Sequence, residues 1–191
     1  MGALPKNKMT SDEYLRWCDA QESGRFELVQ GEVIMMSPET NRHLDVKSEA
    51  WLAFRTALKK AKSKCRAVAD GAGVRIDEST VREPDFSVQC AHRDPDSVLL
   101  NEPIIVAEVV SPSSKRSDSG SKVAEYFRVA SIQHYLIIDP YISAVILHSR
   151  DADGGDLHTR FFKNGEIELT PPGILVSVSD LLGLGFDEGE L

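Results

Sequence analysis

Cysteine is scarce in this sequence of 191 residues, which has only Cys18, Cys65 and Cys90, far apart and without a Cys-x-x-Cys pair. An odd number at such spacing argues against a disulfide framework or a zinc ribbon. We therefore expect three free thiols in a reducing, cytoplasmic compartment. Long apolar runs and an apolar signal core are also missing, so no membrane partner is expected.

Several signatures of common enzyme classes are absent as well. The sequence contains no P-loop, no Gly-x-Ser-x-Gly, no His-Glu-x-x-His and no dinucleotide fingerprint, so those chemistries have no support. The composition, 41% hydrophobic and 27% charged, is typical of a globular protein. We expect a single domain over residues 1–191, with its core at about 10–180.

The negative charge is concentrated at one end of the chain. The net charge is −8, but the acidic C-terminal segment 151–191 holds nine acidic and two basic side chains, which leaves −1 for residues 1–150. A nearly neutral body does not exclude nucleic acid, whereas a uniformly acidic one would repel it. In the basic stretch 55–66, Lys59 and Lys62 are candidate phosphate contacts; the alternative is a solvated helix face.

Apolar periodicity and turn residues predict an α/β fold with a mixed β-sheet flanked by helices. The expected elements are a helix at 10–24, hairpin strands at 26–29 and 33–36, a long helix at 39–62, strands at 65–69, 73–76, 85–90 and 104–110, a helix at 119–129, a strand at 135–138, and edge strands at 142–149 and 158–163. The long helix rests on the spacing of Leu44, Trp51, Leu52, Phe54 and Leu58. Strands 104–110 and 135–138, joined by a helix, should be parallel and central. The remainder is short, acidic and punctuated by Gly and Pro.

Three carboxylates lie in predicted strands rather than in loops. Glu27 lies in the first hairpin strand, Asp85 opens the strand at 85–90, and Glu108 is embedded in the most apolar run. By alternation, Glu108 shares a face with Val106 and Val110, where an ionised carboxylate is costly without a cation, a metal or several donors. The alternative is an edge-strand charge or a buried ion pair with an arginine, which we favour for Glu27 taken alone. For Glu108 we favour a functional role.

Acids that converge from neighbouring strands make a site of hard oxygen ligands. Asp85, Glu108 and the backbone carbonyl of Val109 together suit Mg²⁺ or Mn²⁺ rather than zinc. Glu27 would complete this shell or hold a water. Lys122, on the helix that follows the Glu108 strand, is the nearby cation.

The segments that carry these residues resemble a known family. They are Glu83-Pro84-Asp85, the AEVVSPSS run at 107–114, then Asp118, Lys122 and Tyr126, and the HYLIIDP run at 134–140. They are similar to the restriction-endonuclease-like family, expanded in cyanobacteria and other bacteria, of the PD-(D/E)XK nuclease superfamily. The FELVQGEV run at 26–33, with the segment to His43, is similar to the family's N-terminal hairpin and first helix. The resemblance spans about residues 10–180.

The resemblance implies a restriction-endonuclease-like fold with an N-terminal β-hairpin. It also implies metal-dependent hydrolysis of phosphodiester bonds in nucleic acid, with DNA as the first candidate. Asp85 is then the motif aspartate, Glu108 the motif acid and Glu27 the additional N-terminal acid. The superfamily lysine, two residues after the acid, is replaced by Val110, and Lys122 is the natural substitute. Lys122 would orient the attacking water or stabilise the transition-state charge.

Other polar residues are candidates for contacts with the substrate. Lys115 and Arg116 lie in a polar turn after the Glu108 strand, suited to backbone phosphates. His43, early in the long helix, would contact phosphate or a carboxylate; an ordinary half-buried histidine is the alternative. A homodimer is expected by analogy, because endonucleases that cut both strands often pair their sites by two-fold symmetry.

Two alternatives from other functional classes stay open. The valine at position 110 suits a catalytically inactive nuclease-fold protein that binds nucleic acid or a protein partner. An assembly protein would instead dimerise through its apolar hairpin and edge strands, indifferent to metal and nucleic acid.

Overall fold

The structure is a computed structural model that describes residues 4–92, 94–111, 120–151 and 153–184. Its helices are α1 (Ser11–Asp19), α2 (Asn41–Lys60), α4 (Ser121–Tyr126) and α5 (Val178–Leu182). Its strands are β1 (Phe26–Val29), β2 (Glu32–Met35), β3 (Arg66–Ala69), β4 (Val74–Asp77), β5 (Thr80–Arg82), β6 (Phe86–Gln89), β7 (Pro103–Val109), β8 (His134–Asp139), β9 (Ala144–Arg150), β10 (Leu157–Phe162), β11 (Glu166–Leu169) and β12 (Ile174–Ser177). The expected elements up to residue 163 are therefore confirmed in type and order. β5 was missed, and the strand expected at an edge over 142–149 lies instead between β8 and β10.

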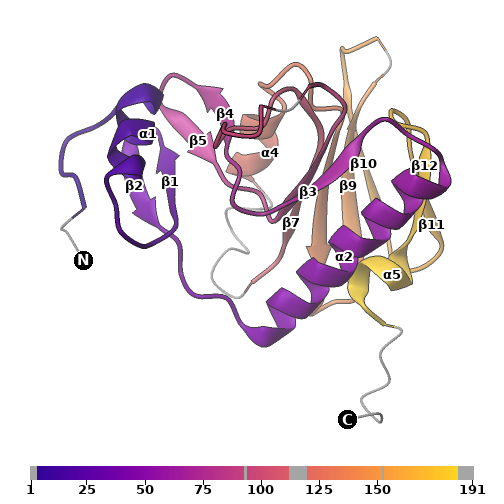
Figure 1. Cartoon of the computed structure of the whole chain (residues 1–191). Helices are drawn as coiled ribbons and strands as arrows, with labels where there is room; N and C mark the ends of the chain where they lie inside the picture. The colour runs from indigo at the N-terminus through magenta and orange to yellow at the C-terminus, as the bar shows by residue number, and fades with distance from the viewer. Residues whose placement is uncertain (1–3, 93, 112–119, 152, 185–191) are drawn as a thin grey trace.

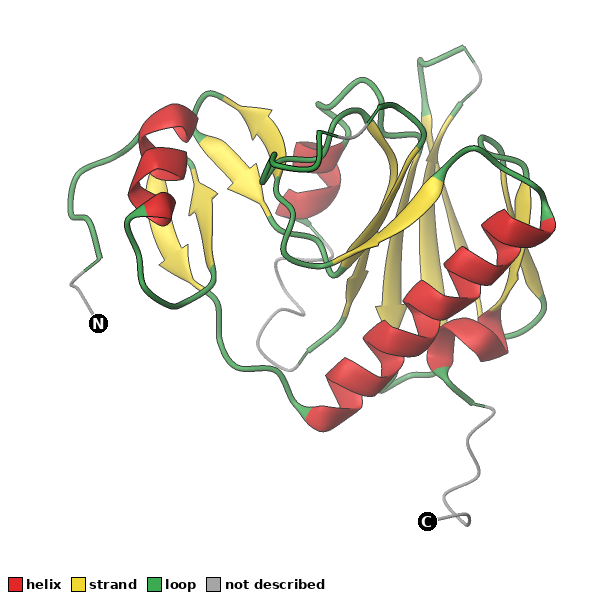
Figure 2. Ribbon diagram, viewed as in Figure 1, coloured by secondary structure: helices red, strands yellow, loops and turns green. Residues whose placement is uncertain are grey.

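The strands form three sheets rather than one (Figure 1). A six-stranded sheet has the order β10-β9-β8-β7-β6-β3, and β7 and β8 are parallel, as predicted. The hairpin β1-β2 does not join this sheet; it pairs with β5 and β4 in a separate four-stranded sheet next to α1. β11 and β12 form a third, two-stranded sheet. Figure 2 shows α2 crossing in front of the large sheet, with α5 beside it.

Local sequence signals explain how the first elements begin and turn. Thr10 and Glu13 form a capping box at the start of α1, and the Thr40 hydroxyl caps α2 through the amide of His43. In the hairpin turn, Gln30 and Gly31 both have positive φ, at 50° and 86°. This geometry is typical of the tight turns that match the twist of paired strands.

The large sheet buries side chains on both of its faces. On one face, Ala107 and Val109 pack with Phe54 of α2; on the other, Val106 packs with Tyr126 of α4. This explains why β7 is apolar at nearly every position. The helical face of α2 differs from the expected one, because it is centred on Val46, Ala50, Phe54 and Leu58. Leu44 and Leu52 lie outside that face and are 42% and 48% exposed.

The acidic C-terminal segment contributes to the core, which its composition did not predict. In β11 the acids Glu166 and Glu168 are exposed, whereas Ile167 and Leu169, which alternate with them, are fully buried. This is the alternation of a strand with one solvated face. The net charge of the segment concealed it, because the acids occupy only the solvent-facing positions.

Two of the three cysteines are joined, so the prediction of three free thiols is wrong. Cys65 and Cys90 form a disulfide, and Cys18 is free and half-buried. The cause is the sheet register. Arg66 pairs with Gln89 across the antiparallel strands β3 and β6, so Cys65, just before Arg66, lies opposite Cys90, just after Gln89. The argument for a reducing compartment from free cysteines therefore no longer holds.

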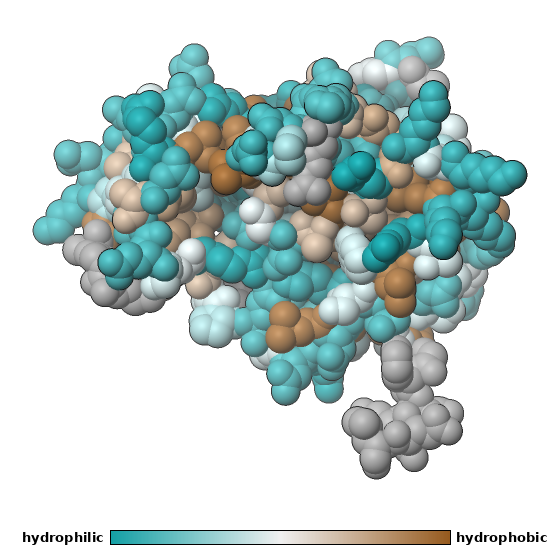
Figure 3. Space-filling model, in the orientation of Figure 1, coloured by the Kyte–Doolittle hydropathy of each residue, from teal (hydrophilic) through white to brown (hydrophobic). Residues whose placement is uncertain are grey.

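The described residues include no helix long and apolar enough to cross a membrane. On the face shown in Figure 3, hydrophobic side chains lie in small, separate patches among hydrophilic ones. Exposed single apolar residues of this kind are normal for a protein surface.

The disulfide should stabilise the folded chain measurably. Cys65→Ser or full reduction is expected to lower the free energy of unfolding by about 2–4 kcal/mol, because the bridge restricts a loop of the unfolded chain. Denaturant titration with and without reductant measures this loss, and Cys18→Ser is the control. Thiol titration of the denatured, unreduced chain should find one thiol per molecule, and three would contradict the bridge.

Candidate active site

The sheet register brings Asp85 and Glu108 to neighbouring positions. Phe86 of β6 pairs with Ala107 of β7 in antiparallel register. Asp85 comes one residue before Phe86 and Glu108 one residue after Ala107, so the two acids lie across from each other. Both are 5% exposed. The carbonyl of Val109, the third expected ligand, follows directly on the same strand.

Asp85 is held by groups from two other elements. Its Oδ2 accepts a hydrogen bond from the amide of Val109 at 2.6 Å, and its Oδ1 lies 3.1 Å from Nε2 of His43 on α2. The ammonium of Lys47, one turn further along α2, is 4.0 Å away. Burial raises the pKa of Asp85, but these donors and charges outweigh it, so the pKa lies below its usual value. His43 is thus placed against a carboxylate, one of its two expected roles.

Glu108 is held from the other side by α4. Its Oε1 accepts a hydrogen bond from the Tyr126 hydroxyl at 2.6 Å and lies 2.9 Å from Nζ of Lys122. Burial, followed by the charge of Glu108, raises the pKa of Tyr126 well above its usual value, so the phenol stays protonated and donates. The structure therefore brings Lys122 to the acid. Val110, where the superfamily has its lysine, is buried in the apolar cluster around Tyr126.

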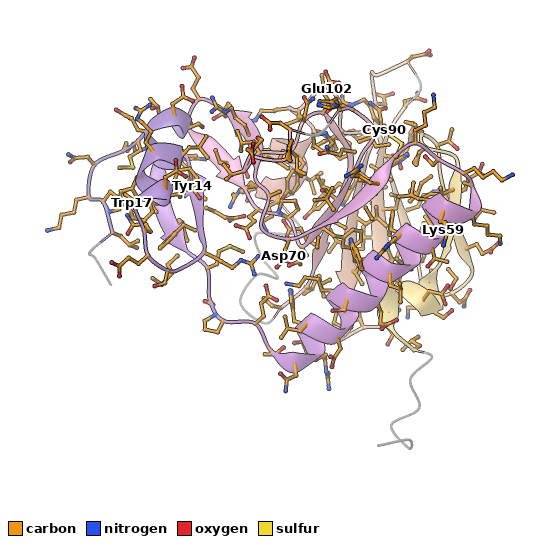
Figure 4. All side chains as sticks on the ribbon, viewed as in Figure 1. Tyr14, Trp17, Lys59, Asp70, Cys90 and Glu102 are labelled. Carbon is orange, nitrogen blue, oxygen red and sulfur yellow. A yellow bond between two sulfur atoms is a disulfide. The ribbon has the colours of Figure 1, made fainter. Side chains whose placement is uncertain are left out.

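A second charge cluster lies at the start of α2. The ammonium of Lys47 binds Glu39 and Asp70, and Arg25 binds Glu39, Asp70 and Glu83. Asp70 lies between the N-terminal part and α2 in Figure 4. The cluster borders a cavity of about 490 Å³ that is lined by Arg25, Asp70 and Glu83. It fastens the N-terminal sheet to the helix that contacts Asp85.

One group of side chains in this region has the geometry of a metal site. Glu39, His43 and Asp85 each offer one ligand atom, and these atoms all lie within 4.8 Å of one another. One imidazole nitrogen with carboxylate oxygens suits a first-row divalent ion such as Mn²⁺. Asp85 belongs to both this group and the pair with Glu108.

Glu27 lies in a buried ion pair with an arginine, the alternative favoured for it on its own. Its Oε2 binds Arg82 at 2.8 Å, and its Oε1 accepts the amide of Glu83 at 3.1 Å. Arg82 is 5% exposed and also binds Glu125 of α4 at 2.7 Å. Arg82 therefore joins the hairpin sheet to the helix that carries Lys122 and Tyr126.

The expected phosphate contacts are not all brought to this place. Lys59 and Lys62 are exposed near the C-terminal end of α2. Lys59 is 16 residues from His43, about 24 Å along a helix axis, and Figure 4 shows it far from Asp70. Lys115 and Arg116 lie outside the described residues.

Sequence reasoning missed Lys47, Arg82 and the carboxylates that bind them. Lys47 had a usable signal, because it follows His43 by four residues and so shares its face of α2. Arg82 had none, since its two acids are 55 and 43 residues away in the chain.

Comparisons with known proteins identify the family and the fold of the chain. The model of the Uma2 family, described as "Putative restriction endonuclease", matches residues 11–182. An uncharacterized protein of Synechocystis sp., slr1290, is 26% identical over 196 residues, covering 96% of this chain and 97% of that protein. A crystal structure from Anabaena variabilis, of "a putative nuclease belonging to DUF820", has a TM-score of 0.68 at 19% identity, with 92% of this chain and 98% of the other covered. The fold is therefore that of a nuclease-like protein.

Removing Arg82 should destabilise the chain more than removing an exposed arginine. Arg82→Met leaves Glu27 and Glu125 buried without their cation, which is expected to cost about 3–5 kcal/mol. The matched control is Arg75→Met, whose ion pair with Asp12 is exposed, with an expected loss below about 1 kcal/mol. Urea titration of both variants measures the difference in the free energy of unfolding. Equal small losses would contradict a stabilising role of Arg82 between Glu27 and Glu125.

Proposed function

Because the chain belongs to the Uma2 family, described as "Putative restriction endonuclease", we propose that it is a metal-dependent nuclease that hydrolyses phosphodiester bonds of DNA. The observation that carries the proposal is the pair of buried acids, Asp85 and Glu108, with Lys122 bound to the second. Two converging carboxylates and a nearby cation supply what metal-assisted phosphodiester hydrolysis requires.

The donor set supports a divalent cation at this pair. Asp85, Glu108 and the Val109 carbonyl would hold Mg²⁺ or Mn²⁺ through oxygen. His43 and Glu39, whose ligand atoms lie close to those of Asp85, would add ligands for an ion that accepts nitrogen. A bound ion of this kind polarises a phosphoryl oxygen and lowers the pKa of a bound water.

Lys122 and Tyr126 would have different roles in the reaction. Lys122, a compact point charge, would move from Glu108 to a phosphoryl oxygen as negative charge develops there. Tyr126 would keep the Glu108 carboxylate oriented through its hydrogen bond. Val110 would exclude water behind them.

Glu27 would support the site without ligating the ion. Both of its oxygens already bind Arg82 and the amide of Glu83. Glu83 lies two residues before Asp85, so this contact fixes the turn that presents the aspartate. Glu27 would therefore be a positioning residue.

We further propose that two copies act together. Cleavage of both DNA strands at one place requires two sites, which a two-fold dimer supplies. The described part of the chain shows one candidate site per copy.

Cleavage should depend on both acids. With Mg²⁺ or Mn²⁺, the wild type is expected to nick or cut plasmid DNA. Asp85→Asn and Glu108→Gln should each slow cleavage more than about 100-fold, since loss of groups that merely support a metal ligand already costs 10–100-fold. Gel electrophoresis against time gives the rates.

The control for Glu108 is Glu168→Gln, which changes an exposed strand glutamate of β11. It should cleave like the wild type. Circular dichroism should show all variants folded. Equal inertness of the wild type and every variant, on DNA and RNA alike, would refute the proposed activity.

Metal binding separates the nuclease from its alternative, an inactive nuclease-fold binder. The alternative draws on one observation: Oε1 of Glu108 already binds Lys122 and Tyr126. Calorimetric titration with Mn²⁺ should show binding that Asp85→Asn abolishes and His43→Ala weakens by about 10–100-fold. His158→Ala, an exposed histidine of β10, is the control. Absence of Asp85-dependent binding would favour the binder.

A further inference from the structure

Two exposed apolar side chains lie at the same edge of the sheet as the candidate active site. β7 and β8 are parallel, with Val109 paired to Ile138, so both strands end at this edge. The turn after β8 presents Tyr141 and Ile142, which are 43% and 46% exposed. Turn tips are usually polar. A tyrosine and an isoleucine together at this position offer an apolar surface next to the candidate active site.

The backbone of the turn that carries these side chains is held by hydrogen bonds. Oδ1 of Asp139 accepts hydrogen bonds from the amides of Tyr141 at 2.9 Å and Ile142 at 3.3 Å. Asp139 itself is 4% exposed. An aspartate that binds the amides two and three residues ahead closes a rigid local turn. The backbone that carries the exposed ring is thus preorganised.

A basic side chain from α2 lies against the tyrosine ring. The guanidinium carbon of Arg42 is 5.6 Å from the centre of the Tyr141 ring. Arg42 directly precedes His43, whose imidazole contacts Asp85. The ring and the proposed catalytic aspartate are therefore contacted by two consecutive residues of α2.

Helix stability does not explain an arginine at this place. Arg42 lies in the first turn of the 20-residue helix α2, which has no acid there. A cation at a helix N-terminus is unfavourable, because the helix dipole is positive at that end. The guanidinium of Arg42 and the positive end of the helix dipole together attract an anion such as a phosphate group.

Three other arginine–aromatic pairs among the described residues show what is particular to this one. They are Arg55–Trp51, Arg150–Phe127 and Arg160–Phe162. Their rings are buried or half-buried, whereas the Tyr141 ring is exposed. Only the Arg42 pair adjoins a residue that contacts Asp85.

We propose that Arg42 and Tyr141 form a subsite for an unpaired nucleotide, and that the substrate of the neighbouring site is nucleic acid with a single-stranded segment. Tyr141 would stack on a base and Arg42 would bind the adjoining phosphate. A paired base has both faces covered by its neighbours in the duplex, so an exposed ring selects unpaired bases. The proposal rests on the proposed nuclease function for its substrate.

Binding measured without cleavage tests the subsite. Fluorescence anisotropy with a labelled single-stranded oligonucleotide, in Ca²⁺ in place of Mg²⁺, should show Tyr141→Ala binding at least about fivefold more weakly than the wild type, from the loss of one stacked base. Binding of a blunt duplex of the same sequence should change less than about twofold. The matched control is Phe161→Ala, which removes a 54% exposed ring on β10. It should leave both affinities unchanged.

A spectroscopic variant reports stacking directly. Tyr141→Trp should bind the single strand like the wild type. Its fluorescence should be quenched by the single strand beyond any change given by the same variant with Arg42→Ala, because the arginine anchors the phosphate. Unquenched fluorescence, or equal affinity of Tyr141→Ala and the wild type, would overturn the subsite.

The remaining outcomes separate the subsite from the nuclease proposal. Wild-type cleavage with unchanged binding by Tyr141→Ala would reject the subsite and keep the nuclease. Tyr141-dependent binding without cleavage by the wild type would keep the subsite and reject the nuclease. Equal losses on single strand and duplex would overturn the preference for unpaired bases. If light scattering gave a lower mass for Tyr141→Ala than for the wild type, the surface of Tyr141 and Ile142 would instead be assigned to contact between copies.

Discussion

The carboxylate of Asp85 is the interaction on which the rest of the site depends. One of its oxygens binds the amide next to Glu108, and the other binds His43 on α2. A buried carboxylate must be compensated, so it draws a strand end and a helix start to one point. If Asp85 were apolar, the hydrogen bonds between the start of α2 and the end of β7 would be lost, and apolar packing alone would hold the two together.

Charge compensation also organises the wider region. Lys122 pairs with Glu108, and Arg82 is shared between Glu27 and Glu125, so the buried acids meet cations from separate elements. Burying acids is costly unless cations compensate them, and these ion pairs supply that compensation. Buried ion pairs add little net stability compared with apolar contacts.

Prediction from the sequence succeeded where the signal was local or periodic. The apolar run of β7 and the hairpin over residues 26–36 each depend on residues close together in the chain, and the structure confirms both. It failed where two distant segments decide the outcome. The Cys65–Cys90 disulfide follows from strand pairing, and the inward alternation of β11 was hidden by its net charge.

The sequence by itself determined which side chains could form a site: a buried strand glutamate, an aspartate after proline, and a lysine on the next helix. These follow from residue type and periodicity, because burying a charge is costly wherever it occurs. Only the tertiary structure decided what each acid meets. Glu27 meets Arg82, and Glu108 meets Lys122. Partners that lie far apart in the chain are chosen by packing and register, which no local pattern encodes.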